Sequence, residues 1–213
     1  MSIHPRLWQA SLLGLCLLLS APSVLAQDSE LFALKNRWEH ITTQTPENDR
    51  AEALDGLAQD ANALVSQYPD NARVLIWKGI VLASQARVSG GLTALGLAKD
   101  ARVVLERAVK LDPDGNNGSA YVTLGALYDR VPGWPVGFGD GDTAEAMFQK
   151  ALAIRPDGID VNYYYAAFLE DEGHKDQALE HARRAVKGEA RKEREVSDEA
   201  LREQARELLA SLE

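Results

Sequence analysis

The chain contains an internal repeat with a period of 43 residues. Residues 87–115 recur as residues 130–158 with nine identical pairs. The pairs are Arg87/Arg130, Val88/Val131, Gly90/Gly133, Gly96/Gly139, Ala101/Ala144, Ala108/Ala151, Pro113/Pro156, Asp114/Asp157 and Gly115/Gly158. Self-similarity with a period of roughly 20–50 residues is typical of solenoids, in which each unit buries its apolar face only against its neighbours. The sequence therefore predicts a solenoid, a class of protein that mostly binds other molecules.

The spacing of apolar residues predicts that the repeats are helical. Before Pro113 and again before Pro156, apolar residues recur at intervals of three and four, the period of an amphipathic helix. Another apolar helix follows each of the Pro-Asp junctions at 69, 113 and 156, and a small residue in that helix, namely Gly79, Gly125 or Ala166, lets paired helices approach closely. We therefore expect an all-α fold of antiparallel helix pairs.

The third unit resembles the tetratricopeptide repeat (TPR). Its matching residues are Asn162, Tyr165, Ala166, Leu169, Gly173, Ala178, Ala182 and Ala185. The resemblance covers residues 72–190 in three units, 72–115, 116–158 and 159–190, and it implies a TPR-like solenoid. Residues 27–71 are expected to form a degenerate N-terminal helix pair, and residues 191–213 a C-terminal capping helix that covers the last apolar face.

The N-terminal segment has the features of a secretory signal peptide. Arg6 precedes an apolar run over residues 7–19, and Val24 and Ala26 suit a signal peptidase. The run is shorter than the roughly 20 apolar residues that a spanning helix needs. We therefore expect residues 1–26 to be removed and the mature protein to be periplasmic.

Cysteine content and charge exclude several classes of function. Cys16 is the only cysteine and lies in the expected leader, behind Leu15, where a lipoprotein signal needs a small residue. The mature chain then holds no disulfide and no thiolate metal site, and no lipid anchor is expected. The formal net charge of −9, without a basic stripe, argues against a nucleic-acid partner.

The corners between the helices of the first two units are longer than in ordinary repeats. They read RVSGGLTALGLAKD over 87–100 and RVPGWPVGFGDGDT over 130–143. Because equivalent corners emerge along one edge of a solenoid, we expect two extended inter-helix loops, side by side, that can enclose a pocket. Trp134 and Phe138 either line that pocket, present a surface to a partner, or fold down to seal the helix pair.

The candidate ligand- or partner-binding residues are Arg87, Arg130, Trp134, Phe138, Asp140, Asp129, Tyr163, Tyr164 and Glu170. First-helix positions are expected to line a groove of the kind that binds extended peptides in this architecture. These positions are Arg73, Ile76, Ile80, Val122, Ala126, Asp129, Asp160, Tyr163, Ala167 and Glu170. They lack the basic cluster with which chaperone-binding TPR proteins clamp a terminal carboxylate.

Metal binding and catalysis have weaker support. His174 and His181 lie seven residues apart and can share a helix face, but His174 falls in an expected turn. Asp140, Asp142 and Glu145 carry oxygen ligands, but Asp142 and Glu145 also have the spacing of a capping box that opens a helix. No catalytic residue, metal or cofactor is expected, and the protein is not expected to be an enzyme.

The second corner also resembles a more specific group. VPGWPVGFGD over 131–140, the junction PDGID over 156–160 and the helix NYYY over 162–165 are similar to the T component of TRAP transporters, over residues 79–187. That resemblance implies a periplasmic scaffold that associates with the solute-binding protein of a carboxylate-type transporter and holds a small organic ligand. The alternative is a structural adaptor in cell-envelope assembly without a small-molecule site.

Overall fold

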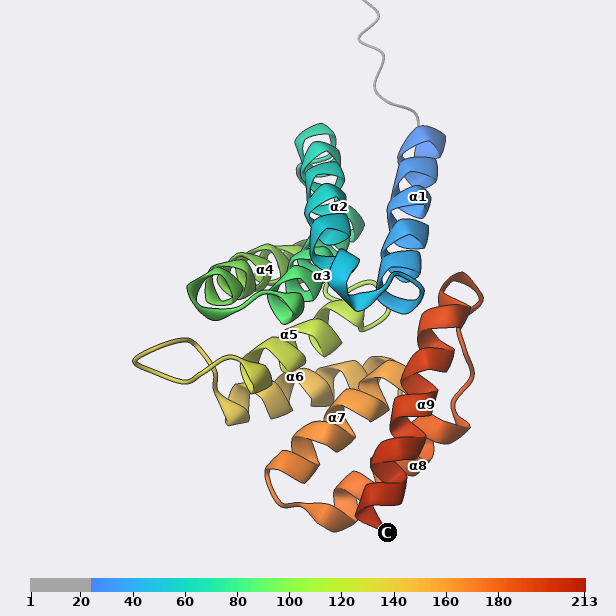
Figure 1. Ribbon diagram of the computed structural model, residues 1–213. Coiled ribbons are helices and arrows are strands. Elements are labelled where there is room, and N and C mark those ends of the chain that lie inside the picture. The colour runs from blue at the N-terminus through green and yellow to red at the C-terminus, as the bar shows by residue number, and fades with distance from the viewer. Residues whose placement is uncertain (1–23) are drawn as a thin grey trace, which may run out of the picture.

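The computed structural model describes residues 24–213, which fold into α-helices with one short 3₁₀ turn and no strand (Figure 1). The helices are α1 (Val24–Thr43), α2 (Glu47–Gln67), α3 (Ala72–Val88), α4 (Gly91–Leu111), α5 (Ser119–Arg130), α6 (Gly141–Ile154), α7 (Ile159–Asp171), α8 (Lys175–Lys187) and α9 (Glu195–Leu212), with the 3₁₀ turn η1 at Lys192–Arg194. Of the expected leader, residues 1–23 lie outside the described part of the chain, and Val24 to Ala26 begin α1.

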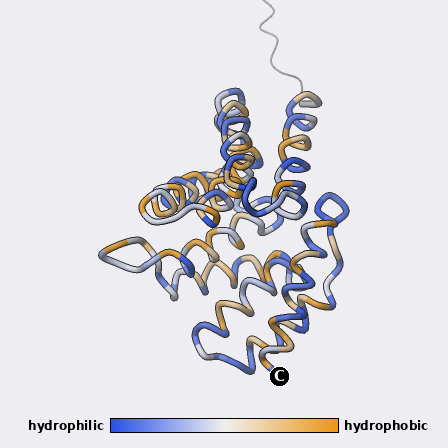
Figure 2. Tube along the Cα trace, in the orientation of Figure 1, coloured by the Kyte–Doolittle hydropathy of each residue, from blue (hydrophilic) through white to orange (hydrophobic). Residues whose placement is uncertain are grey.

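Consecutive helices form pairs, α1 with α2, α3 with α4, α5 with α6 and α7 with α8, and neighbouring pairs pack on one another. The last helix, α9, packs on α7 and α8 and also reaches α1. The expected all-α solenoid of antiparallel helix pairs with a C-terminal capping helix is confirmed. In the part of the chain that is described, no helix could cross a bilayer, and Figure 2 shows polar residues interrupting the apolar ones along every helix.

Close contact within two helix pairs depends on glycine. A Cβ at Gly79 of α3 would lie 2.4 Å from the side chain of Leu105 on α4. In the next unit a Cβ at Gly125 of α5 would lie 2.7 Å from the ring of Phe148 on α6. Leu105 and Phe148 are separated by one repeat period, and both are fully buried. The duplicated units therefore repeat one packing solution, as the small residues in the sequence indicated.

The first of the two expected loops is instead helical. α3 ends at Val88 and α4 begins at Gly91, so the corner is only two residues long and the prediction of an extended loop over 87–100 was wrong. Leu95 is half-buried and Ala98 and Ala101 are buried, and this spacing of three continues the apolar stripe of α4. Packing of that stripe outweighs the cost of a glycine inside a helix, about 1 kcal/mol at Gly96.

The second corner is an extended loop between α5 and α6, as expected. Pro132 and Pro135 lack the backbone N–H that a helix needs, whereas the first corner contains no proline. The loop is closed by hydrogen bonds from the Gly139 N–H to the Pro132 carbonyl, at 3.0 Å, and from the Asp140 N–H to the Tyr128 carbonyl, at 2.9 Å. Its path is therefore fixed by its own backbone.

The start of α6 differs from the expected one. The Asp140 side chain accepts a hydrogen bond from the Thr143 N–H at 2.7 Å and caps the helix. We expected Asp142 to open this helix with Glu145, but α6 begins at Gly141, before the start at Thr143 that this pattern requires. Asp140 is therefore a capping residue, and this structural role accounts for it without a ligand-binding role.

Candidate binding groove

The helix pairs curve around a pocket of about 790 Å³. Its walls come from α1, α3, α5, α7 and α9, from the start of α4 and from the loop after α5. Much of the lining is aliphatic, including Ile80, Leu92, Leu95, Val122, Leu127 and Leu201. Pockets of roughly 300–1,000 Å³ with an apolar lining and a few polar groups are typical of small-molecule sites.

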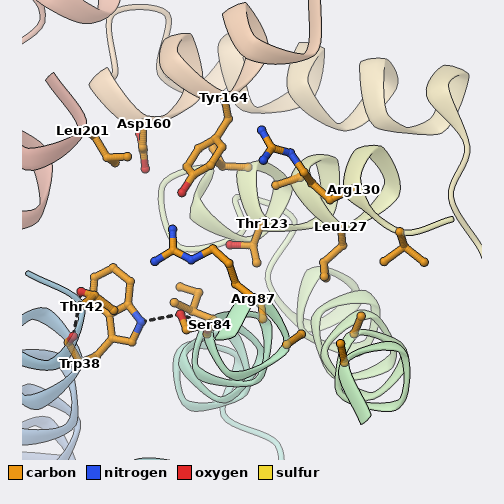
Figure 3. Close-up of a pocket in the computed structure, with 18 of the residues that line it drawn as sticks. Trp38, Thr42, Ser84, Arg87, Thr123, Leu127, Arg130, Asp160, Tyr164 and Leu201 are labelled. Carbon is orange, nitrogen blue, oxygen red and sulfur yellow. Dashed lines mark hydrogen bonds between the residues drawn. The ribbon is translucent and has the colours of Figure 1, made fainter. Parts of the chain in front are cut away.

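Arg87 and Arg130 occupy equivalent positions of the repeat, at the ends of α3 and α5, and both line this pocket. Figure 3 shows the guanidinium of Arg87 directed into the pocket, below the hydroxyl of Tyr164. Within residues 24–213 the Arg87 side chain makes no hydrogen bond and no ion pair. Its charge is therefore available inside the pocket.

Arg130 differs from Arg87 because it has a partner. Its Nε donates to Oδ2 of Asp129 at 3.2 Å. Asp129 is only 12% exposed and does not itself line the pocket, and burial raises the pKa of its carboxyl. Asp129 therefore acts on the pocket only through Arg130.

Two tyrosines of α7 form part of the wall. Tyr163 and Tyr164 both line the pocket, and their ring centroids lie 5.2 Å apart at a steep angle. Burial raises the pKa of Tyr163, so its hydroxyl keeps its proton and can donate a hydrogen bond. Both residues were among the candidates that the sequence indicated.

Asp160 is the one carboxylate among the lining residues. It is buried, forms ion pairs with Arg155 and with Arg191, the latter at 3.0 Å, and accepts a hydrogen bond from the Val161 N–H at 2.8 Å. Burial acts to raise the pKa of Asp160, but Arg191 and Arg155 outweigh it and hold the pKa to about 2. Asp160 is therefore a structural anion and is unsuited to proton transfer near neutral pH.

Arg194 brings a third cation to the lining. Its guanidinium lies over two indole rings, 4.9 Å from the centroid of Trp38 and 5.5 Å from that of Trp77. Burial and the neighbouring Arg191 lower the pKa of Arg194 to about 10, which leaves it charged at neutral pH. No carboxylate of the described chain pairs with it. The lining thus holds more positive than negative charge, although the whole chain is acidic.

Trp134 and Phe138 have different roles. Phe138 is half-buried, packs edge-on against Tyr128 at 5.4 Å, and lies 4.3 Å below the guanidinium of Arg102. Trp134 is 90% exposed at the tip of the loop. Neither residue lines the pocket. The sealing interpretation is therefore right for Phe138 and wrong for Trp134.

Half of the ten expected groove positions line the pocket, and Asp129, paired with Arg130, is among those that do not. Ile80, Val122, Ala126, Asp160 and Tyr163 line the pocket. Ile76 and Ala167 are buried in the core instead, and Arg73 forms an ion pair with Asp28 at 2.9 Å. Glu170 is exposed near the end of α7 and does not line the pocket.

The lining residues that the two terminal helices contribute were not predicted from the sequence. Trp38 and Thr42 come from α1, and Arg194, Leu201 and Gln204 come from η1 and α9. From the sequence, α9 was expected only to cap the solenoid. The repeat pattern does not predict that α9 closes the groove. This helix lies outside the duplicated units, so no equivalent helix in another unit indicates its position.

The histidines considered as metal ligands have other contacts. Nδ1 of His181 lies 2.8 Å from Oδ1 of Asn162, and its ring packs against Tyr165 at 4.7 Å. His174 is the N-cap residue of α8 and makes no side-chain capping bond. Among residues 24–213, no three His, Cys, Asp or Glu side chains form a cluster able to hold a metal ion.

Comparison with known proteins supports the fold. No protein-family model and no curated protein matches the sequence. The structure is similar to that of a thermophilic TPR protein of Thermus thermophilus, with 20% identity and a TM-score of 0.58 over 87% of this chain and 91% of that one. It is also similar to MamA, with 19% identity and a TM-score of 0.48 over 78% of this chain and 90% of that one. The first of these similarities shows that the chain has a TPR-like fold.

Proposed function

We propose that the protein is an exported, non-enzymatic scaffold that binds a partner protein at the rim of its groove and holds a ligand inside the groove. The observation that carries this proposal is the pocket itself. It has the volume of a small-molecule site, and Arg87 projects into it without a partner in the described fold. A charged side chain that the fold leaves unpaired in a concave site is available to a ligand.

The rim of the groove supports a protein contact. Trp134, Val136 and Leu92 are 90%, 61% and 86% exposed. Val136 and Leu92 also line the pocket, and Trp134 lies on the same loop as Val136. Exposed apolar side chains on a fixed loop mark interaction sites, and tryptophan is enriched among the residues that dominate binding energy. We therefore assign the contact with the partner protein to this rim.

The finer proposal is an accessory role in a TRAP-type solute transporter. It is supported by the similarity of the second corner to the T component, by the expected signal peptide, and by the small-molecule size of the pocket. The partner is then a periplasmic solute-binding protein. An adaptor in envelope assembly does not need a pocket with an unpaired cation. Catalysis is not proposed, because the one carboxylate in the lining is held in ion pairs.

A pull-down from the periplasmic extract of the native cell tests the proposal. The mature protein serves as bait beside Trp134→Ala and a matched control, Phe32→Ala, which removes another exposed aromatic, 57% exposed on α1. We expect the mature protein and Phe32→Ala to retain a solute-binding protein, identified by mass spectrometry, and Trp134→Ala to lose it. Equal capture by all three baits, or capture of envelope-assembly proteins alone, contradicts the proposal.

A further inference from the structure

We propose that η1 and the start of α9 form a latch that holds the groove closed. In the open form the C-terminal helices α6–α9 swing away from α1–α5, and Arg194 leaves the rings of Trp38 and Trp77. This inference goes beyond the proposed function, because it concerns how the groove is entered and applies to any ligand or partner. Three observations support it: the division of the apolar core, the polar contact that closes the groove, and the firm anchorage of η1 on its other side.

The apolar core is divided between the two ends of the chain. One cluster of buried residues comes from the segment α1–α5 and includes Leu31 and Ile41 of α1. A second cluster comes from α6–α9 and includes Phe148 of α6 and Leu212 of α9. Among the described residues, none of the apolar clusters contains residues of both α1 and α9. The contact between the first and last helices therefore has no apolar core of its own.

The helices between these two ends stay packed when the ends separate. In a solenoid each unit packs on its neighbours, so the contacts among α5, α6 and α7 do not depend on α1 meeting α9. A small apolar cluster of Tyr121, Val122, Ala151 and Val161 joins these three helices. Opening therefore requires a rotation at this cluster, and no helix has to unfold.

The contact that closes the groove is polar. The guanidinium of Arg194 lies 4.9 Å from the ring centroid of Trp38 and 5.5 Å from that of Trp77. Three residues later, the Ser197 N–H donates to a carboxylate oxygen of Glu39 at 2.8 Å. Figure 1 shows the start of α9 beside the end of α1, where these contacts lie. Because water can bind the guanidinium, the carboxylate and the N–H after separation, opening replaces these interactions with hydration.

Closure places Arg194 in an unfavourable setting. Its Nε is buried with no hydrogen-bond partner among the described residues. Burial and the nearby Arg191 lower the pKa of Arg194 to about 10. Lys35 also lies over the Trp77 ring, 5.4 Å from its centroid, and burial and the charges of Arg73 and Arg194 lower the pKa of Lys35. Release of Arg194 therefore relieves repulsion between cations and restores the hydration of its Nε, which offsets the lost ring contacts.

The other side of η1 is anchored to the C-terminal helices. The backbone N–H and the Nε of Arg191 each donate to Oδ2 of Asp198 at 2.9 Å, and its Nη2 donates to Oδ1 at 2.6 Å. The same Nη2 donates to Oδ2 of Asp160 on α7 at 3.0 Å. Both carboxylates are buried, and hydrogen bonds between charged groups are stronger than neutral ones. We therefore expect η1 and α9 to move together with α7, and Arg194 to be the residue that is released.

Double electron–electron resonance between two nitroxide labels tests the latch. Residues 27–213 contain no cysteine, so labels attach only at introduced ones. Asn36→Cys and Ala210→Cys place labels at exposed positions of α1 and α9, across the latch. Asn36→Cys with Lys110→Cys, exposed on α4, places both labels within α1–α5 and is the control pair. The mature protein should show a main distance and a longer, minor one across the latch, and one distance in the control pair.

Arg194→Gln should raise the population of the longer distance by roughly threefold or more, the factor that a lost cation–π contact corresponds to, and leave the control pair unchanged. Arg206→Gln is the matched control variant and should change neither pair, because Arg206 is an exposed arginine of α9 that pairs with Glu203. Far-UV circular dichroism measures the folding of each variant. Alkylation of Thr123→Cys, which lines the groove, by a bulky maleimide should become faster by a similar factor in Arg194→Gln.

Each contrary outcome overturns a defined part of the inference. An unchanged distance distribution across the latch in Arg194→Gln overturns the latch, and so does an equal change in Arg206→Gln. If both label pairs change in Arg194→Gln, or its helical signal is lost, Arg194 supports the whole fold and is not a latch. An unchanged alkylation rate at Thr123→Cys contradicts the opening of the groove. None of these measurements involves a ligand or a partner, so the inference and the proposed function fail or hold separately.

Discussion

The carboxylate of Glu39 accepts a hydrogen bond from the backbone N–H of Ser197 at 2.8 Å, across 158 residues of sequence. Glu39 lies on α1, and Ser197 is the third residue of α9, whose first N–H groups have no partner within the helix. An anion at a helix N-terminus is also favoured by the helix dipole. This bond joins the first helix to the last one and closes the groove on that side.

Replacing Glu39 by alanine should loosen this closure. The loss of a capping hydrogen bond costs about 1 kcal/mol, so we expect the free energy of unfolding, measured with urea, to fall by that amount. Amide hydrogen exchange at Ser197 should become faster. Glu52→Ala, on the exposed face of α2, is the control and should change neither quantity. If Ser197 exchanges at the same rate in Glu39→Ala, the bond does not hold α9 in place.

Asp160 should make stability sensitive to acid. Its pKa is held to about 2 in the folded protein, below the ordinary value of 3.8. The stability that its ion pairs contribute is therefore complete above pH 4 and is lost as the pH falls toward 2. The difference between the two pKa values corresponds to about 2 kcal/mol of stability. We expect Asp160→Asn to lose about 3 kcal/mol at pH 7, because Arg155 and Arg191 lose a buried counter-charge, and to show less further loss in acid.

An exposed pair provides the comparison for Asp160. Asp70 is 79% exposed and pairs with Arg107 at 2.6 Å. Surface pairs contribute roughly 0–1 kcal/mol, so Asp70→Asn should leave the pH profile of urea unfolding nearly unchanged. A profile of Asp160→Asn that still parallels the original protein below pH 4 would assign the acid sensitivity to other groups.

Gly125 and Gly56 should respond to alanine in opposite directions. At Gly125 a new methyl group meets the Phe148 ring at 2.7 Å, so we expect a loss of roughly 1–3 kcal/mol from overpacking. At Gly56, inside α2, the nearest atom is 3.8 Å away, on the flexible side chain of Arg37. Helix propensity should then stabilise Gly56→Ala by up to roughly 1 kcal/mol. Thermal and urea unfolding measure both changes, and a destabilised Gly56→Ala would contradict this view of α2.

Alanine substitution should lower stability at one of the two aromatic residues of the loop and leave it nearly unchanged at the other. Phe138 packs on Tyr128 and Arg102, so Phe138→Ala should cost about 2 kcal/mol, less than for a fully buried phenylalanine. Trp134 is 90% exposed, so Trp134→Ala should stay within about 0.5 kcal/mol of the original protein. Urea unfolding tests the pair, and a comparable loss in Trp134→Ala would mean that its ring packs on the protein in solution.

The repeat made part of this structure predictable. Arg87 and Arg130 share a repeat position, and a solenoid brings such positions to one side, which explains why both line the pocket. The close approach of helices at Gly79 and Gly125 follows from the same pattern. These features depend on local periodicity and on contacts between neighbouring units.

Other features depend on contacts that the repeat does not encode. Gly96 suggested a loop, but burial of Ala98 and Ala101 makes the segment helical. The roles of Trp134 and Phe138 depend on which of the two rings packs on Tyr128. The sequence pattern does not distinguish between them. α9 contributes to the groove because it packs near α1, and local sequence patterns do not predict a contact between helices so far apart in the chain.

Methyl NMR of the mature protein during titration with a small-molecule extract of the periplasm tests the central claim, that the groove binds a ligand, most directly. We expect shifts in the methyl signals of Leu95, Leu127 and Leu201, which line the groove, and none in those of Val103 and Leu111, exposed residues of α4 that do not line it. Shifts confined to Val103 and Leu111, or equal shifts in both sets, would contradict the account.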